Sequence, residues 1–306
     1  MSKTFSITIL GSNSALPTSE RYPTAQMLNV SERFFLIDCG EGTQIQLRKN
    51  KIKFTKIDHI FISHLHGDHC FGLIGLISTL GLMGRKTNLY LHAHPELEKV
   101  FQPQLDYFCK DLPYKVVFEP FDTKQKQVIY SDKHLEVETI PLIHRIPTVG
   151  FLFREKPEER KIRKEFVFVH KPSIKEILSI KKGEDFLNAD GRLMANREIT
   201  LDPPPIRSYA FCTDTKYTEK IIDQIKGVDV LYHESTFTKD KEKLAKKTYH
   251  ATAEQAAKIA IKAGVGMLLI GHFSSRYKSL KPFLDEAQMV FPDAQLAKEG
   301  DVVSIL

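Results

Sequence analysis

The stretch Ser63-His64-Leu65-His66-Gly67-Asp68-His69 places four candidate metal ligands within six residues. Three imidazoles and a carboxylate this close together would crowd one another, and the imidazoles would repel if protonated. A buried divalent cation is the simplest way to hold them. Oxygen and imidazole ligands without a thiolate suit zinc, manganese and other borderline to hard divalent ions. The His-x-His-x-Asp-His spacing therefore predicts a metal site.

The segments on either side predict where this site lies. Residues 57–62 are typical of a strand, and the apolar run 71–83 is typical of a buried helix. The four ligands are therefore expected on a strand-to-helix loop.

Three later strands are also expected to end next to a candidate ligand. His144 follows the strand-like run 140–143, Asp214 follows Ser208–Cys212, and His272 follows 265–270. Asp38 also lies at a predicted strand end. Its carboxylate could orient a metal-bound histidine or could serve a turn or helix cap, and both interpretations remain open.

Length and composition fit an ordinary globular protein. The chain has 306 residues, 42% of them hydrophobic, enough for one large or two modest domains. No apolar run reaches the roughly 18 residues of a membrane span, and the start of the chain reads into a strand at 3–10 and not into a signal peptide. These features predict a cytoplasmic protein without a membrane partner.

The four cysteines are widely separated and form no Cys-x-x-Cys pair, which argues against a thiolate zinc site or a disulfide framework. They are Cys39, Cys70, Cys109 and Cys212. We expect them to be reduced thiols.

Positive charge is concentrated in three groups. The formal net charge is +6, and residues 154–182 alone carry ten Lys or Arg against five Glu, a net of +5. Residues 239–247 add five Lys against two acids, and residues 48–56 form the third group. Such runs are often only solvated surfaces, but three of them beside a metal motif favour a polyanionic substrate.

Regular helices are predicted over 44–49, 95–107, 173–181, 218–226, 253–263 and 281–289. Residues 154–202 interrupt the regular alternation of strands and helices with dense charge and several prolines. A capping box at Ser173 and Glu176 predicts a helix there, and Phe166–Val169 has the alternation of a short strand. This segment is predicted to be an insertion that projects from the main body.

The candidate ligands and several other stretches resemble the short form of the ribonuclease Z family, within the metallo-β-lactamase superfamily. The matching stretches run from residue 10 to residue 277 and are Leu10-Gly11-Ser12, Asp38 to Gln44, Ser63 to His69, His233 to Phe237, His250 to Glu254 and His272 to Tyr277. The resemblance implies an α+β fold in one domain over residues 1–306. That fold is an αβ/βα sandwich, with two mixed β-sheets flanked by helices.

The resemblance also implies two metal ions per subunit, zinc first and manganese as the alternative. One ion is assigned to His64, His66 and His144, and the other to Asp68, His69 and His272. Asp214 is assigned to bridge them. Two metals about 3.5–4 Å apart can activate a water and stabilise both reacting oxygens of a phosphodiester.

Roles for four further positions come from the same resemblance. Asp68 is the expected general base as well as a ligand, and His250 the expected proton donor to the leaving oxygen. Glu234 could orient His250 or serve only a helix-cap or surface role, and both remain open. Arg276 is expected to contact a substrate phosphate, because its guanidinium fork suits one.

The basic insertion occupies the position of the flexible arm with which this family grips tRNA. Its candidate RNA-binding residues are Arg160, Lys161, Arg163 and Lys164. The arm departs from the family because the usual Gly-Pro-rich tip is missing and Phe166–Val169 stands in its place. The family is typically homodimeric, with the arm of one subunit serving the active site of the other.

These features imply an endoribonuclease that removes the 3′ trailer of precursor tRNA and leaves a 3′-hydroxyl after the discriminator base; no DNA partner is expected. The alternative is another binuclear metallo-hydrolase, such as a phosphodiesterase, a sulfate ester hydrolase or a thioester hydrolase, which would share all seven ligands. Such an enzyme would not need the three basic groups or Arg276. A non-enzymatic RNA-binding protein would explain the basic groups but not the metal set.

Overall fold

The computed structural model describes residues 4–306, so Lys3, the first residue of the first predicted strand, lies outside the described residues. The chain divides into two compact units. The larger unit comprises residues up to 130 together with 137–153 and 207–306, and the smaller comprises 131–136 and 154–206. Each unit has its own hydrophobic core.

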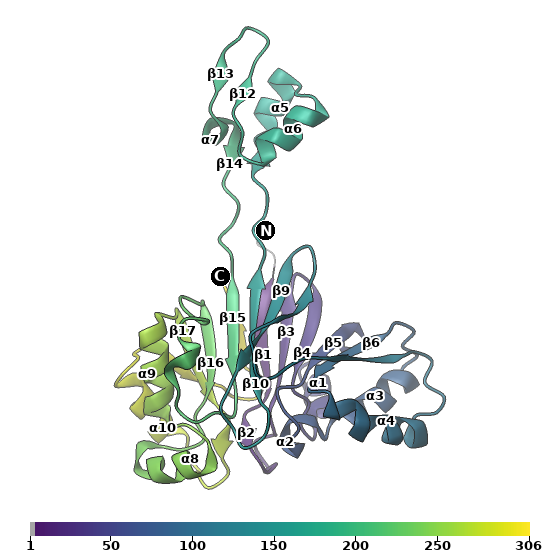
Figure 1. Cartoon of the computed structure of the whole chain (residues 1–306), viewed down its shortest axis with the longest axis vertical. Helices are drawn as coiled ribbons and strands as arrows, with labels where there is room; N and C mark the ends of the chain where they lie inside the picture. The colour runs from purple at the N-terminus through teal and green to yellow at the C-terminus, as the bar shows by residue number, and fades with distance from the viewer. Residues whose placement is uncertain (1–3) are drawn as a thin grey trace. The chain divides into compact units, whose positions relative to one another are not determined.

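The larger unit is built on two seven-stranded sheets (Figure 1). In the first, antiparallel pairs at one edge continue into the parallel strands β4 to β7, so the sheet is mixed. Its order is β20 (Val302–Ser304), β1 (Phe5–Gly11), β3 (Ala25–Val30), β4 (Arg33–Ile37), β5 (Ile57–Phe61), β6 (Leu89–Ala93) and β7 (Val116–Pro120).

The second sheet contains a run of four parallel strands, β15, β16, β17 and β19. Its order is β19 (Ala294–Leu296), β17 (Met267–Gly271), β16 (Val230–Glu234), β15 (Ser208–Cys212), β10 (Val149–Glu155), β9 (Leu135–Pro141) and β8 (Val128–Ser131). Two short strands, β2 (Asn13–Ser14) and β18 (Phe273–Ser274), pair separately.

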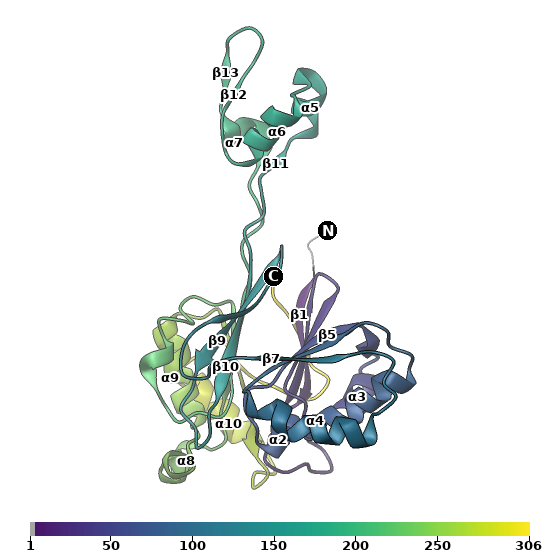
Figure 2. The same ribbon diagram turned by 45° about the vertical axis from the view of Figure 1, so that its right-hand side comes forward.

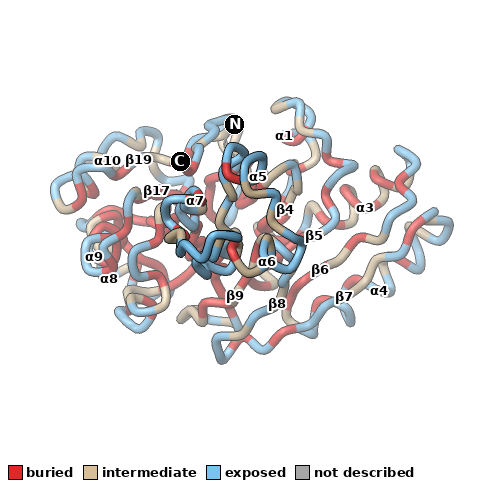
Figure 3. Tube along the Cα trace, turned by 90° about the horizontal axis from the view of Figure 1, so that it is seen from above, coloured by how far each residue is buried: buried red, intermediate tan, exposed pale blue. Residues whose placement is uncertain are grey.

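Helices cover the outer faces of both sheets (Figure 2). One core joins the first sheet to its helices, which are α1 (Thr43–Lys49), α3 (Leu73–Leu82) and α4 (Glu96–Phe108). A second core joins the other sheet to α9 (Ala253–Ala263) and α10 (Lys281–Gln288). Figure 3 shows that buried residues lie along the strands of this unit. The arrangement confirms the predicted α+β class with two mixed, helix-flanked sheets.

Aromatic side chains fill the space between the two sheets. Phe61 of the first sheet meets Phe151 of the second with ring centroids 5.6 Å apart. Phe35 likewise meets Phe153 at 6.1 Å, and the Tyr209 hydroxyl donates to Gln26 Oε1. This packing holds the sheets face to face.

Local sequence explains the best-defined helix. Thr252 caps α9 by accepting a hydrogen bond from the Gln255 backbone nitrogen at 3.2 Å, and the Gln255 side chain accepts one from the Thr252 nitrogen. Gly264 ends the helix at a φ of 63°, a left-handed conformation that glycine adopts without steric cost. Both predicted ends of this helix are confirmed.

One helix prediction and one loop prediction in this unit are wrong in part. The region 218–226 contains only the 3₁₀ helix η2 (Glu219–Ile221). After it, the backbone nitrogens of Ile222 and Gln224 donate to carbonyl groups three residues earlier, as in turns. Those turns bury Ile221 and Ile225 without a full α-helix. The metal-motif segment is also not all loop, because Asp68 and His69 lie in the short helix α2 (Gly67–Cys70).

The remaining elements of the larger unit are short. They are the 3₁₀ helices η1 (Phe54–Lys56) and η3 (Lys239–Lys241) and the helix α8 (Glu242–Thr248). Among the described residues no helix has both the length and the apolarity needed to cross a membrane.

The smaller unit packs around Phe166, Ile180, Phe186 and Ile199. The strand predicted at Phe166–Val169 is wrong. These residues lie in helix α5, where Phe166 packs edge-on against Phe186 at 5.0 Å, and this contact overrides the strand preference of alternating Phe and Val.

The capping box predicted at Ser173 is confirmed at the start of α6. The elements of this unit are β11 (Lys161–Ile162), α5 (Lys164–His170), α6 (Ile174–Lys181), β12 (Phe186–Leu187), β13 (Leu193–Met194), α7 (Asn196–Ile199) and β14 (Thr200–Leu201). Strand β11 pairs with β14, and β12 with β13.

Candidate metal centre

Parallel strands from both sheets end at one region of the larger unit. His64 lies shortly after β5, Asp214 two residues after β15, and His272 directly after β17. Ligands in α/β sheets gather at the carboxyl ends of parallel strands, where the chain leaves the sheet and side chains are free to converge. All seven predicted ligands are brought together here.

The first group of candidate ligands is His64, His66, His144 and Asp214, which offer donor atoms within 4.8 Å of one another. His66 Nδ1 lies 3.0 Å from His64 Nε2 and 3.3 Å from His144 Nε2. Asp214 Oδ2 is 3.6 Å from the Nε2 atoms of both His64 and His144. Three imidazole nitrogens and one carboxylate oxygen therefore surround one point.

The second group is Asp68, His69 and His272. Asp68 Oδ2 lies 3.5 Å from His69 Nε2 and 3.6 Å from His272 Nε2. The other oxygen of Asp214, Oδ1, lies 3.4 Å from His69 Nε2 and 3.0 Å from His272 Nε2. Asp214 thus presents one oxygen to each group, which is the geometry of a bridging carboxylate.

The buried nitrogens of the second group fit a metal ion. His69 Nε2 and His272 Nε2 are buried and have no hydrogen-bond partner within the described part of the chain. An unsatisfied buried polar atom is costly, and coordination to a cation would remove that cost. The opposite ring nitrogens are bonded elsewhere, which fixes the tautomer that leaves each Nε2 free to coordinate.

Asp38 orients two of these imidazoles from a fully buried position. Its Oδ2 accepts from His69 Nδ1 at 2.7 Å and from the Ser63 hydroxyl at 2.9 Å. The Ser63 oxygen lies 3.1 Å from His64 Nδ1 and can accept from it. Asp38 therefore makes the orienting contact with a candidate ligand, and its φ of 55° is a strained conformation held by these bonds.

Glu234, the last residue of β16, orients the imidazoles of His272 and His250 as Asp38 orients those of His69 and His64. It is fully buried, and its Oε2 accepts from the Thr236 hydroxyl at 2.8 Å. The Thr236 oxygen lies 3.0 Å from His272 Nδ1 and accepts from it. Glu234 Oε1 lies 2.8 Å from His250 Nδ1. The surface alternative for Glu234 is excluded by its burial.

The electrostatics of the centre favour a positive charge inside it. Burial opposes charging of His69, yet the carboxylates of Asp68, Asp38 and Asp214 raise its pKa well above the usual value. Burial would also raise the pKa of Asp214, but His272, His69 and His64 hold that pKa well below its usual value. The carboxylates of Asp214 and Asp68, whose pKa values are both lowered, stay ionised and attract a cation.

His250 is tuned toward its protonated form. Burial alone would lower its pKa, but the charge and hydrogen bond of Glu234 raise the pKa of His250 to about 9. A protonated imidazole at neutral pH can donate a proton.

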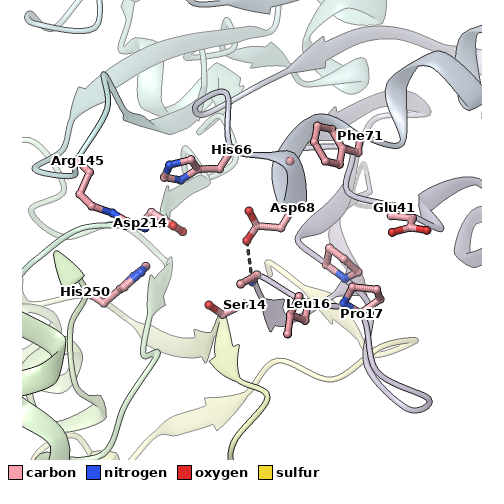
Figure 4. Close-up of a pocket in the computed structure, with 13 residues that line it drawn as sticks. Ser14, Leu16, Pro17, Glu41, His66, Asp68, Phe71, Arg145, Asp214 and His250 are labelled. Carbon is pink, nitrogen blue, oxygen red and sulfur yellow. Dashed lines mark hydrogen bonds between the residues drawn. The ribbon is translucent and has the colours of Figure 1, made fainter.

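A cavity of about 450 Å³ opens onto the centre (Figure 4). Asp68, Asp214 and His250 line it, together with Arg145. Within residues 4–306, Arg145 is the one Lys or Arg side chain in this lining. Arg276 is exposed and does not belong to the lining, so its predicted phosphate contact stays a prediction. Sequence reasoning missed Arg145, although it adjoins the candidate ligand His144.

Comparisons with known proteins identify the family. "Ribonuclease Z" of Phocaeicola vulgatus is 51% identical over 301 residues, 98% of this chain and 97% of that protein. "Ribonuclease Z" of Bacteroides fragilis strain YCH46 is 49% identical over 98% of this chain and 99% of its own length. The chain belongs to the ribonuclease Z family. It is therefore a metal-dependent phosphodiester hydrolase.

A solved structure and two family models also match the chain. The crystal structure of human tRNase Z, short form, matches with a TM-score of 0.73 and 24% identity, covering 98% of this chain and 99% of that chain. The profile described as Beta-lactamase superfamily domain matches residues 200–273, and that described as Anti-Pycsar protein Apyc1 matches residues 5–161. The predicted metallo-β-lactamase fold is confirmed.

Proposed function

We propose that the chain cleaves precursor tRNA endonucleolytically after the discriminator base, releases the 3′ trailer and leaves a 3′-hydroxyl on the tRNA. The observation that carries the proposal is the pairing of two ligand groups through Asp214, with His250 beside them, in a chain 51% identical to a "Ribonuclease Z".

Two divalent ions, Zn²⁺ first and Mn²⁺ as the alternative, fit the two ligand groups. His64, His66 and His144 would hold one ion, and Asp68, His69 and His272 the other. Asp214 would share its oxygens between them. When bound, such ions lower the pKa of water and stabilise charge on the reacting phosphodiester.

The residues around the ligands supply proton transfer. We expect Asp68 to take the proton of the attacking water. Burial alone would raise the pKa of its carboxyl, but His69 and His272 hold that pKa well below the usual value and so keep the carboxyl ionised. His250 donates a proton to the leaving 3′-oxygen, with Glu234 holding its ring. In-line attack requires base and acid on opposite sides of the phosphorus.

We infer that Arg145 contacts a phosphate next to the bond that is cut, because it is the one Lys or Arg side chain in the cavity lining within the described residues. We expect Arg145→Ala to lower kcat/KM for precursor tRNA by roughly tenfold to a hundredfold, because the substitution removes a charge-assisted hydrogen bond to phosphate. Arg276→Ala is the matched variant at the other candidate arginine. Steady-state kinetics of both variants show which of the two arginines contacts the phosphate. A large loss of activity for Arg276→Ala alone would move the phosphate contact to Arg276.

The smaller unit is proposed to bind the tRNA backbone. Lys161, Arg163 and Lys164 are exposed, whereas Arg160 is half-buried and paired with Asp202 at 2.6 Å. Exposed cations on one short segment suit phosphate contacts, while Arg160 is better placed to stabilise the unit.

Replacing Lys161, Arg163 and Lys164 together by Ala is expected to weaken precursor tRNA binding and make it less salt-dependent. The slope of log affinity against log salt should fall by about 0.7–0.9 for each phosphate that the variant no longer neutralises. Filter binding over a series of salt concentrations measures this slope. A control triple variant at the exposed Lys110, Lys115 and Lys124 should keep the wild-type slope. An unchanged slope in the first variant would remove the smaller unit from the binding surface.

The experiment that tests the function uses precursor tRNA labelled at its 5′ end, with a defined trailer. Wild-type protein is expected to give one tRNA product ending in a 3′-hydroxyl, to lose activity with a chelator and to regain it when Zn²⁺ or Mn²⁺ is restored. Failure to cleave, alongside rapid hydrolysis of a sulfate ester, a thioester or a simple phosphodiester, would favour the alternative metallo-hydrolase.

We also propose that the protein is a homodimer and lies in the cytoplasm. The homodimer is what membership of the ribonuclease Z family implies. Light scattering should give twice the 35.0 kDa chain mass. Fractionation of the source cells should recover the protein with the cytoplasm. A monomer mass would remove the proposed exchange of arms between subunits.

A further inference from the structure

Phe71 is a large aromatic side chain left exposed inside the proposed active-site cavity. It follows α2, the helix that carries Asp68 and His69, and precedes α3. Its side chain is 70% exposed and lines the cavity. Leu16, which is 61% exposed, lines the same cavity. Exposed apolar side chains beside a reaction centre suit contact with a flat apolar group of the substrate.

The ring of Phe71 packs against Gly67. A Cβ atom on Gly67 would lie 2.3–2.7 Å from three atoms of this ring, so the ring packs directly on the glycine backbone. The Phe71 backbone nitrogen also donates to the Gly67 carbonyl at 2.9 Å. A ring that already rests on the backbone has less conformational freedom to lose on binding than a ring without such a contact.

The cavity has two chemically different sides (Figure 4). In that view Arg145, Asp214 and His250 lie on one side of Asp68, and Phe71 and Glu41 lie on the other. The exposed Glu41 carboxylate disfavours a phosphate on its side, whereas a neutral nucleobase meets no such repulsion.

The direction of the proposed reaction decides which nucleotide faces Phe71. His250 protonates the leaving 3′-oxygen, which belongs to the tRNA, so the tRNA strand lies on the side of His250 and Arg145. The strand beyond the phosphate then leads to the side of the cavity that Phe71 lines. The nucleotide that faces Phe71 is therefore the first nucleotide of the trailer.

We propose that Phe71, with Leu16 beside the same cavity, holds the nucleobase of the first trailer nucleotide by stacking, and so positions the bond that is cut. Base–aromatic stacking is tolerant of sequence because every base has a π face. The inference rests on the proposed function. It makes Phe71 a substrate-positioning residue.

The test combines protein and substrate changes. Precursor tRNA is prepared with either a normal or an abasic first trailer nucleotide, and kcat/KM is measured for wild type, Phe71→Leu and Phe71→Tyr. With the normal substrate, Phe71→Leu should lose roughly tenfold, while Phe71→Tyr, which keeps the ring, should stay close to wild type. With the abasic substrate, wild type should itself lose about tenfold, and Phe71→Leu should lose nothing further.

The matched control is Phe108→Leu, an exposed phenylalanine of α4 outside the cavity lining, which should match wild type on both substrates. Bound metal is measured in each variant to separate substrate positioning from damage to α2. An equal loss for Phe71→Leu on both substrates, or no loss on either, overturns the stacking role while leaving the proposed function intact. If wild type cleaves neither precursor, the proposed function fails, and the inference fails with it.

Discussion

Asp68→Ala is expected to reduce cleavage of precursor tRNA by at least about a thousandfold. Asp68 Oδ2 lies near both His69 Nε2 and His272 Nε2, so the substitution removes a candidate ligand. It also removes the proposed base. The same oxygen accepts from the Ala15 backbone nitrogen at 2.8 Å, which holds the carboxylate in the cavity. Single-turnover cleavage and the amount of bound metal measure the two effects.

Two further variants separate the roles of Asp68. Asp68→Asn keeps one oxygen for a metal but cannot act as a base, so it should retain more metal than Asp68→Ala while remaining nearly inactive. Asp106→Ala, at an exposed aspartate of α4, is the control and should behave as wild type. Cleavage by Asp68→Ala that also persists in chelator would contradict the proposed metal mechanism.

His250→Ala is expected to lower kcat by roughly a hundredfold to ten-thousandfold, the usual contribution of a positioned acid. The protonated ring is the proposed donor, so wild-type activity should fall as pH rises through the pKa of His250, about 9. The Glu234→Gln variant lacks the carboxylate that raises the pKa of His250. Burial then lowers the pKa of His250. The falling limb of the pH–rate profile should therefore move to lower pH.

The profiles are measured for kcat under saturating precursor tRNA, with His94→Ala as the control at a histidine outside the metal groups. His250→Ala should lose the falling limb altogether, because the titrating group is absent. A Glu234→Gln profile that keeps its limb at the wild-type pH would show that His250 is not the acid. Bound metal should be checked as well, since Glu234 also holds His272 through Thr236.

Much of the centre could be predicted from sequence because its ligands lie at the ends of recognisable strands. Four ligands are adjacent in the chain, and the strands before His144, Asp214 and His272 have clear apolar patterns. Helix α9 was predictable to its ends because its cap and its terminal glycine are local features. The strand predicted at Phe166–Val169 is wrong because packing between residues twenty positions apart outweighs the local strand preference.

The sequence by itself determined the chemistry of the site, meaning the types of ligand, their order and the strands that carry them. Only the tertiary structure decided which side chains share the cavity. Glu234 became buried between His250 and the Thr236–His272 pair, and Arg145 and Phe71 took opposite sides of Asp68. The physical reason is that pattern and spacing are set by neighbours along the chain. Burial, pKa and the lining of a cavity depend on segments that are separate in the chain, such as those of Phe71, Arg145 and His250, which only folding brings together.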